Sequence, residues 1–431
     1  KTRPRRTPRD GAYGRLDDAG RLMKKNRTDR PTAVLRLLVV SEFVPGRISR
    51  FAYTEASGLF HVGLVECTTS GGVWRMAFSC FNRGFSILSG AAAPAPAPAP
   101  TPSSAIPPAF AASPPPRSQM EQIQHLYLDI AGLSLHVADL GKGESGVVVF
   151  LHGFPEIWYS WRYQMIAVAA AGFRAIAPDF RGYGLSQQPP EPEKNASWSD
   201  LISDLLAILD HLSVPKAFLV GKDFGALPAY HFALLHPDRV SGVITLGVPF
   251  VTESISTDTP PKGFYMSRWQ EPGRAEADFG RFDVKTVVRN IYILFSSSEL
   301  PVAGENQEIM DLVDPSTPLP LWFSEEDLSV YSTLYEKSGF SFPLQIPYRK
   351  MQQFANFADP KVEVPALLVM GEKDYVIKFP GMEDYIRSGM VKKYVPDLDI
   401  KFLPEGTHFV QEQLPEVVNQ LIISFLNNHT S

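Results

Sequence analysis

A short apolar run leads directly into a glycine-flanked carboxylate in Ala217-Phe218-Leu219-Val220-Gly221-Lys222-Asp223-Phe224-Gly225. The unbroken run is typical of a strand buried on both faces, and residues 226–235 behind it carry helical spacing. Two glycines around a central residue let the backbone turn sharply between strand and helix, and this turn presents the central side chain above the sheet. The pattern makes Asp223 a candidate nucleophile. Its alternative interpretation is a helix cap after a Gly-rich turn.

Short apolar runs of the same kind recur through residues 120–431. They predict strands over residues 126–130, 133–137, 147–151, 175–177, 243–246, 366–370 and 400–403, and a further helix over residues 201–212. Strands separated by helices predict an α/β fold, with a mostly parallel central sheet flanked by helices. Ligands of such sheets bind at the carboxyl ends of the strands, where the sequence also places Asp223.

Residues 1–119 differ from the rest of the chain in charge and composition. They hold 17 Lys and Arg against 7 Asp and Glu, which leaves 24 against 39 for residues 120–431. Residues 91–116 are rich in Ala and Pro, a composition that favours extended polyproline II and cannot pack a core. We therefore expect no domain in residues 1–119, but an N-terminal extension that is disordered or not native. The alternative is an organelle transit peptide. The arginines favour this interpretation, and four early aspartates disfavour it.

Composition narrows the remaining function classes. The hydrophobic fraction of 44% excludes wholesale disorder, and the lack of an 18-residue uncharged apolar run predicts no membrane span. Both cysteines, Cys67 and Cys80, lie in the extension, so no disulfide or thiolate metal site is expected downstream. A reducing compartment, the cytoplasm, is the expected location, or a plastid if the extension is a transit peptide. Because residues 120–431 are acidic, no nucleic-acid partner is expected.

A second motif predicts the amides that stabilise a reacting oxygen. His152-Gly153-Phe154-Pro155 follows the predicted strand that ends at Leu151. In an elbow-type site, one amide comes from this loop and the other from the residue after the nucleophile. The candidates are the backbone N–H groups of Phe154 and Phe224. The alternative for the motif is a tight turn at a strand end, and the bond before Pro155 is a candidate for the cis form.

The general base and its supporting acid are expected downstream of the nucleophile. His408 lies in Glu405-Gly406-Thr407-His408-Phe409, just after the last predicted strand. Asp374 lies in Gly371-Glu372-Lys373-Asp374-Tyr375, after the strand that ends at Met370. Nucleophile, acid and base thus follow one another in the order that elbow-type hydrolases use. The alternative for the Glu-Lys-Asp loop is a solvated turn.

Residues 120–431 resemble a soluble epoxide hydrolase of the α/β-hydrolase superfamily, of the plant type without an appended phosphatase domain. Beyond the loops above, residues 152–162 and 179–186 match that family nearly residue for residue. The resemblance implies an α/β-hydrolase core over residues 120–249 and 363–431 and a helical lid over residues 250–362.

The same resemblance implies that two lid tyrosines point at the nucleophile. By position they are Tyr265, ahead of Gln270-Glu271-Pro272-Gly273, and Tyr348, in Tyr348-Arg349-Lys350-Met351. One departure concerns the elbow, because the family usually has His-Asp-Trp where this chain has Lys222-Asp223-Phe224. A cation beside Asp223 favours the ionised carboxylate, but it can also pair with it and blunt its nucleophilicity. The sequence leaves these alternatives open.

An aspartate nucleophile indicates alkyl electrophiles. It forms an ester, and water can attack the carbonyl of that ester when His408 removes a proton from the water and Asp374 orients the histidine. A serine would instead form an inert ether. An epoxide oxygen also needs a proton donor, a task that the phenols of Tyr265 and Tyr348 fit. The expected reaction converts a hydrophobic fatty-acid or aryl epoxide and water to a diol, with no metal or cofactor, in a monomer or homodimer.

Two other functions remain as alternatives. A haloalkane dehalogenase also uses an aspartate ester, but such enzymes often place a Trp after the nucleophile, where this chain has Phe224. A catalytically silent binding protein of the same fold is suggested only by Lys222, and the five retained candidate side chains disfavour it.

Overall fold

The computed structural model describes residues 114–191, 196–251, 260–350 and 359–430, and the backbone of three strands between residues 62 and 88. The chain divides into two compact units, Lys1–Ser103 and Ser104–Ser431. The second unit contains every candidate site residue.

The second unit is built on an eight-stranded sheet. Its strands, in spatial order, are β11 (Leu398–Leu403), β10 (Ala366–Gly371), β9 (Val240–Leu246), β8 (Ala217–Lys222), β6 (Val147–Leu151), β7 (Arg174–Pro178), β5 (Leu133–Leu140) and β4 (Gln124–Ile130). The strands from β11 to β7 pair in parallel, and β5 and β4 add an antiparallel edge. Every strand predicted from the apolar runs is present, so the predicted α/β class and mostly parallel sheet are confirmed.

Helices cover both faces of this sheet because its central strands are apolar on both sides. In β6, Val148 and Phe150 pack into one buried cluster with α2 (Arg162–Ala170) and α11 (Pro415–His429). Val149 and Leu151 point the other way, into the cluster of α3 (Trp198–His211) and α4 (Ala226–Leu235). Side chains that alternate between two apolar layers explain the unbroken apolar runs in the sequence.

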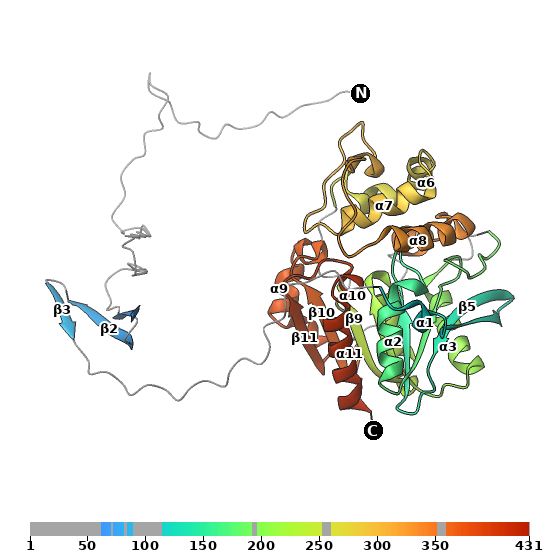
Figure 1. The fold of residues 1–431 in the computed structure, drawn as a ribbon. Helices are drawn as coiled ribbons and strands as arrows, with labels where there is room; N and C mark the ends of the chain where they lie inside the picture. The colour runs from blue at the N-terminus through green and yellow to red at the C-terminus, as the bar shows by residue number, and fades with distance from the viewer. Residues whose placement is uncertain are drawn as a thin grey trace, which may run out of the picture. The chain divides into compact units, whose positions relative to one another are not determined.

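The segment between β9 and β10 is helical. It contains α5 (Tyr265–Gln270), α6 (Arg274–Phe279), α7 (Val284–Phe295) and α8 (Glu325–Ser338). In Figure 1, α6, α7 and α8 lie together above one end of the sheet. These helices fall within residues 250–362, where a lid is expected; the boundaries between core and lid stay a prediction.

The first unit contains three strands that the sequence analysis did not predict. They are β1 (Val62–Thr69), β2 (Gly72–Phe81) and β3 (Gly84–Leu88), paired as an antiparallel sheet. Two residues separate each strand from the next, as in tight hairpins, and apolar and polar residues mix along the strands. The remainder of residues 1–113 lies outside the described residues, so the expected nature of this extension stays a prediction. Within the described ranges, none of the helices has the length and apolar character needed to cross a membrane.

Candidate active site

The nucleophile elbow forms where β8 meets α4. β8 ends at Lys222, a short 3-10 turn spans Asp223–Gly225, and α4 starts at Ala226. Asp223 has a φ of 51°, in the left-handed region that costs energy for a residue with a side chain. A side chain on Gly225 would lie 2.1 Å from the carbonyl oxygen of Leu151, so only glycine fits this close approach. The turn holds Asp223 at the carboxyl end of the sheet, 6% exposed.

The structure brings the three predicted triad residues together. The Nε2 atom of His408 lies 3.2 Å from Oδ2 of Asp223, and its Nδ1 atom lies 3.0 Å and 3.1 Å from the two oxygens of Asp374. Asp374 follows β10 and His408 follows β11, so parallel strands deliver all three to one edge of the sheet. All three are buried.

The charges of the triad follow from these contacts. The carboxylate of Asp374 can only accept, so Nδ1 of His408 carries a hydrogen. Burial acts to lower the pKa of His408, but the carboxylates of Asp374 and Asp223 outweigh it and raise that pKa. Burial likewise acts to raise the pKa of Asp223, but the hydrogen bond and charge of His408 and the charge of Lys222 hold it below its usual value. Asp223 is therefore ionised, as an attacking carboxylate must be.

The two candidate oxyanion amides face Asp223. The backbone N–H of Phe154 donates to Oδ1 of Asp223 at 3.3 Å, and the backbone N–H of Phe224 also bonds this carboxylate. The bond between Phe154 and Pro155 is cis, as its motif suggested. β6 and β8 are neighbours in the sheet, so the loop after β6 meets the elbow after β8. The Phe154 amide thus faces Oδ1, a carboxylate oxygen that could become an oxyanion if the Asp223 carbonyl were attacked, and the Phe224 amide bonds the same carboxylate.

Both candidate tyrosines lie in the same buried region. Tyr265 begins α5 and Tyr348 lies in a short π-helical segment, Gln345–Arg349. The ring centroid of Tyr348 lies 5.6 Å from that of Phe154 and 5.3 Å from that of Phe224, which places this phenol beside both oxyanion residues. Burial, with the negative charge of Asp223, raises the pKa of both tyrosines well above its ordinary value. Both phenols therefore keep their protons.

The structure adds two residues that sequence reasoning missed. The hydroxyl of Tyr375 lies 3.3 Å from that of Tyr265, and the ring centroid of Tyr375 lies 4.7 Å from that of His408. Glu156, fully buried, accepts the N–H of Gly153 at 3.1 Å and a hydrogen bond from Gln411. The sequence signal available for Tyr375 was its position directly after Asp374, and the signal for Glu156 was its position directly after Pro155.

A buried ionic cluster ties the lid helices to the core beside this site. Arg162 on α2 bonds Glu412 on α10 (Val410–Gln413) at 2.5 Å and Asp327 on the lid helix α8 at 2.9 Å. The hydroxyls of Tyr292 on α7 and Tyr331 on α8 donate to the same Glu412 at 3.2 Å and 3.1 Å. Burial raises the pKa of Glu412 to about 7 although Arg162 opposes the shift. This cluster connects the lid to the segment that carries His408.

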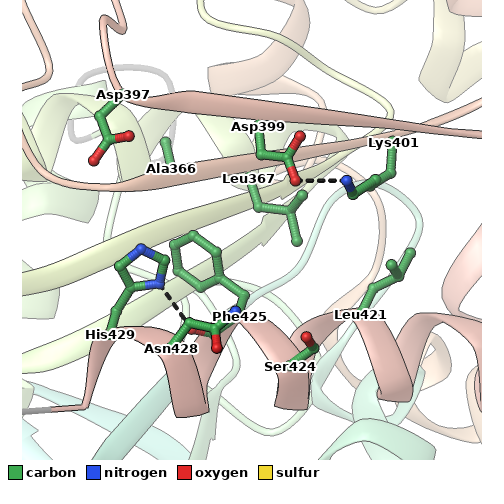
Figure 2. Close-up of a pocket in the computed structure, with 10 residues that line it drawn as sticks. All are labelled: Ala366, Leu367, Asp397, Asp399, Lys401, Leu421, Ser424, Phe425, Asn428 and His429. Atoms are coloured by element: carbon green, nitrogen blue, oxygen red, sulfur yellow. Dashed lines mark hydrogen bonds and ion pairs between the residues drawn. The ribbon is translucent and has the colours of Figure 1, made fainter.

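A shallow pocket lies elsewhere, between β11 and α11 (Figure 2). It has a volume of about 150 Å³, and its charged lining includes Asp399 paired with Lys401 at 2.7 Å. None of its lining residues belongs to the triad. In the parts of the chain that the structure describes, no group of three or more His, Cys, Asp or Glu is arranged to hold a metal ion.

The elbow, the Asp–His–Asp arrangement and the parallel sheet define an enzyme of the α/β-hydrolase fold, and the alpha/beta hydrolase fold family matches residues 146–413. Epoxide hydrolase 2 of Siraitia grosvenorii is 36% identical over 319 residues, which cover 71% of this chain and 99% of that protein. The crystal structure of an epoxide hydrolase from Vigna radiata matches with a TM-score of 0.66 and 34% identity, covering 72% of this chain and 99% of that one. Potato epoxide hydrolase I matches with a TM-score of 0.63, 32% identity, and coverage of 71% and 99%. The chain belongs to the epoxide hydrolase family.

Proposed function

We propose that this chain hydrolyses epoxides to vicinal diols through an ester on Asp223. In the first step, an oxygen of Asp223 attacks an epoxide carbon and the carbon–oxygen bond of the ring breaks. The departing oxygen takes a proton from Tyr265 or Tyr348, whose raised pKa values keep both protonated until then. The product of this step is an ester of Asp223 that carries the β-hydroxyl group.

In the second step, water attacks the ester carbonyl. His408 takes the water proton at Nε2, and Asp374 orients the ring through Nδ1. The oxyanion develops at the oxygen that Phe154 and Phe224 face. When the intermediate collapses, the ester bond breaks and the leaving oxygen takes the proton held by His408. The second proton of the attacking water passes from Asp223 to the tyrosinate left by the first step, so Asp223 is a carboxylate and the tyrosine a phenol again.

The observation that carries this proposal is a carboxylate, not a hydroxyl, at the elbow, between two backbone amides and a buried histidine. Aromatic rings surround the two tyrosines. The ring centroid of Trp269 lies 5.3 Å from that of Tyr265 and 5.1 Å from that of Tyr348, and the ring centroid of Phe295 lies 4.8 Å from that of Tyr265. These contacts support a hydrophobic substrate, an aryl epoxide or a fatty-acid epoxide. A cytoplasmic location and a monomeric or homodimeric state stay predictions from the sequence.

The test is diol formation from stilbene oxide and from an epoxy fatty acid, followed in ¹⁸O-water with enzyme in excess. In the proposed route the first diol takes its new oxygen from Asp223, so it is unlabelled, and the label enters the enzyme. A labelled diol in the first turnover would show direct attack by water. Halide release from a chlorinated alkane in place of diol would identify a dehalogenase.

A further inference from the structure

Lys222 lies against the reactive nitrogen of the base. It is the last residue of β8, is fully buried, and directly precedes Asp223. Its Nζ atom lies 3.1 Å from Nε2 of His408 and 5.8 Å from the ring centroid of Phe409. This ammonium has no role in the two-step scheme given above.

Two groups of opposite charge compete for that one nitrogen. Nε2 of His408 lies 3.2 Å from Oδ2 of Asp223 and 3.1 Å from Nζ of Lys222. Since Nδ1 carries the hydrogen bonded to Asp374, a protonated ring can donate from Nε2 only to Asp223. A neutral ring instead offers the Nε2 lone pair, which can accept from Lys222. At Nε2, the protonated ring therefore has Asp223 as its partner, and the neutral ring has Lys222.

We infer that Lys222 is a positioning residue that returns His408 to its neutral, basic form once Asp223 has been esterified. This inference rests on the proposed function. Before alkylation, the negative charge of Asp223 favours the imidazolium and offsets the ammonium. The ester carries no charge, so Asp223 no longer offsets the ammonium, which then favours loss of the Nε2 proton to bulk water. Proton release thus follows formation of the bond that His408 must help to hydrolyse.

The surrounding charges agree with this division of roles. The groups that face His408 are Asp374 and Tyr375 after β10, Asp223 and Lys222 from β8, and Glu156 after β6. Asp374 bonds Nδ1 of His408, not Nε2, and takes no part in the bond to the epoxide carbon. Lys222 lowers the pKa of His408, against the carboxylates that raise it. Of these five groups, only Asp223 changes its charge when the ester forms.

The experiment measures ester hydrolysis in a single turnover as a function of pH. Full-length enzyme in excess is mixed with stilbene oxide, and the alkylated fraction is read by intact mass after acid quenching. Lys222→Met removes the charge and keeps the length of the side chain. The acid limb is the pH range over which ester hydrolysis slows as the pH falls, and we expect it to lie about one pH unit higher in Lys222→Met than in the unaltered enzyme. Below this limb hydrolysis should be about tenfold slower, while the plateau rate at higher pH is retained. Lys222→Arg keeps the charge and should keep the limb.

Two outcomes overturn the inference. One is an acid limb of Lys222→Met that coincides with that of the unaltered enzyme, and the other is an equal loss of hydrolysis at every pH. Circular dichroism and the thermal midpoint report folding, and Lys222→Gln provides the same charge test if the methionine variant does not fold. Absence of diol from the unaltered enzyme would instead refute the proposed function itself, so the two failures are distinguishable.

Discussion

Asp223 combines an ordinary carboxylate with a backbone conformation that few residues adopt, with φ at 51°. Replacing it by Asn keeps the shape and removes the charge that attacks the epoxide. We predict that Asp223→Asn lowers turnover by about 10⁴-fold in freshly made protein, measured as diol formation. The exposed Asp129 gives a matched control, since Asp129→Asn should keep activity within about twofold. Persistent full activity of Asp223→Asn would refute the nucleophile assignment.

The two buried tyrosines make a second prediction at the scale of single residues. Tyr265→Phe and Tyr348→Phe each keep the ring and remove the proton. We expect the double variant to slow ester formation by about 10²–10⁴-fold, because the epoxide oxygen would leave without a proton. Pre-steady-state mixing measures this step, and Tyr127→Phe, at a residue that is 56% exposed, is the control. Unchanged alkylation in the double variant would place the acid elsewhere.

At the scale of elements, the cluster of Arg162, Glu412 and Asp327 joins α2, α10 and α8. Arg162→Met leaves two carboxylates buried without their cation. We predict that its free energy of unfolding falls by about 3–5 kcal/mol, measured by urea denaturation. Arg117→Met breaks an exposed ion pair with Glu121 and should change stability by less than about 0.5 kcal/mol. A loss of under about 1 kcal/mol in Arg162→Met would mean that the cluster does not stabilise the lid against the core.

The sequence predicted some strands of the fold and missed others. Strands β6 and β8 are short apolar runs that each lead into a glycine-containing turn, so local pattern alone identifies them. β1, β2 and β3 were missed because apolar and polar residues mix along them and arginine-rich sequence precedes them. The sequence made Asp223, Asp374 and His408 candidates because each follows a strand end, and the structure brings their side chains into contact. The contact of Lys222 with His408 joins positions 186 residues apart, and its direction depends on side-chain packing that no local pattern encodes.

At the scale of the whole molecule, all proposed chemistry lies in the unit Ser104–Ser431. We predict that residues 114–431, expressed alone, form diol at a rate within about twofold of the full chain, because a compact unit with its own core folds by itself. Parallel assays of both proteins on stilbene oxide measure this. Loss of diol from the shorter protein, with a folded circular dichroism spectrum, would show that the first unit takes part in the reaction.

The central claim is a covalent ester on Asp223 that His408 helps to hydrolyse, and intact mass of His408→Gln tests it most directly. After incubation with stilbene oxide, the variant should gain the mass of one substrate, with the added mass on the peptide that contains Asp223. His211→Gln, at an exposed position on α3, should turn over normally and show no gain. An unchanged mass in folded His408→Gln, or a label on another peptide, would contradict the account.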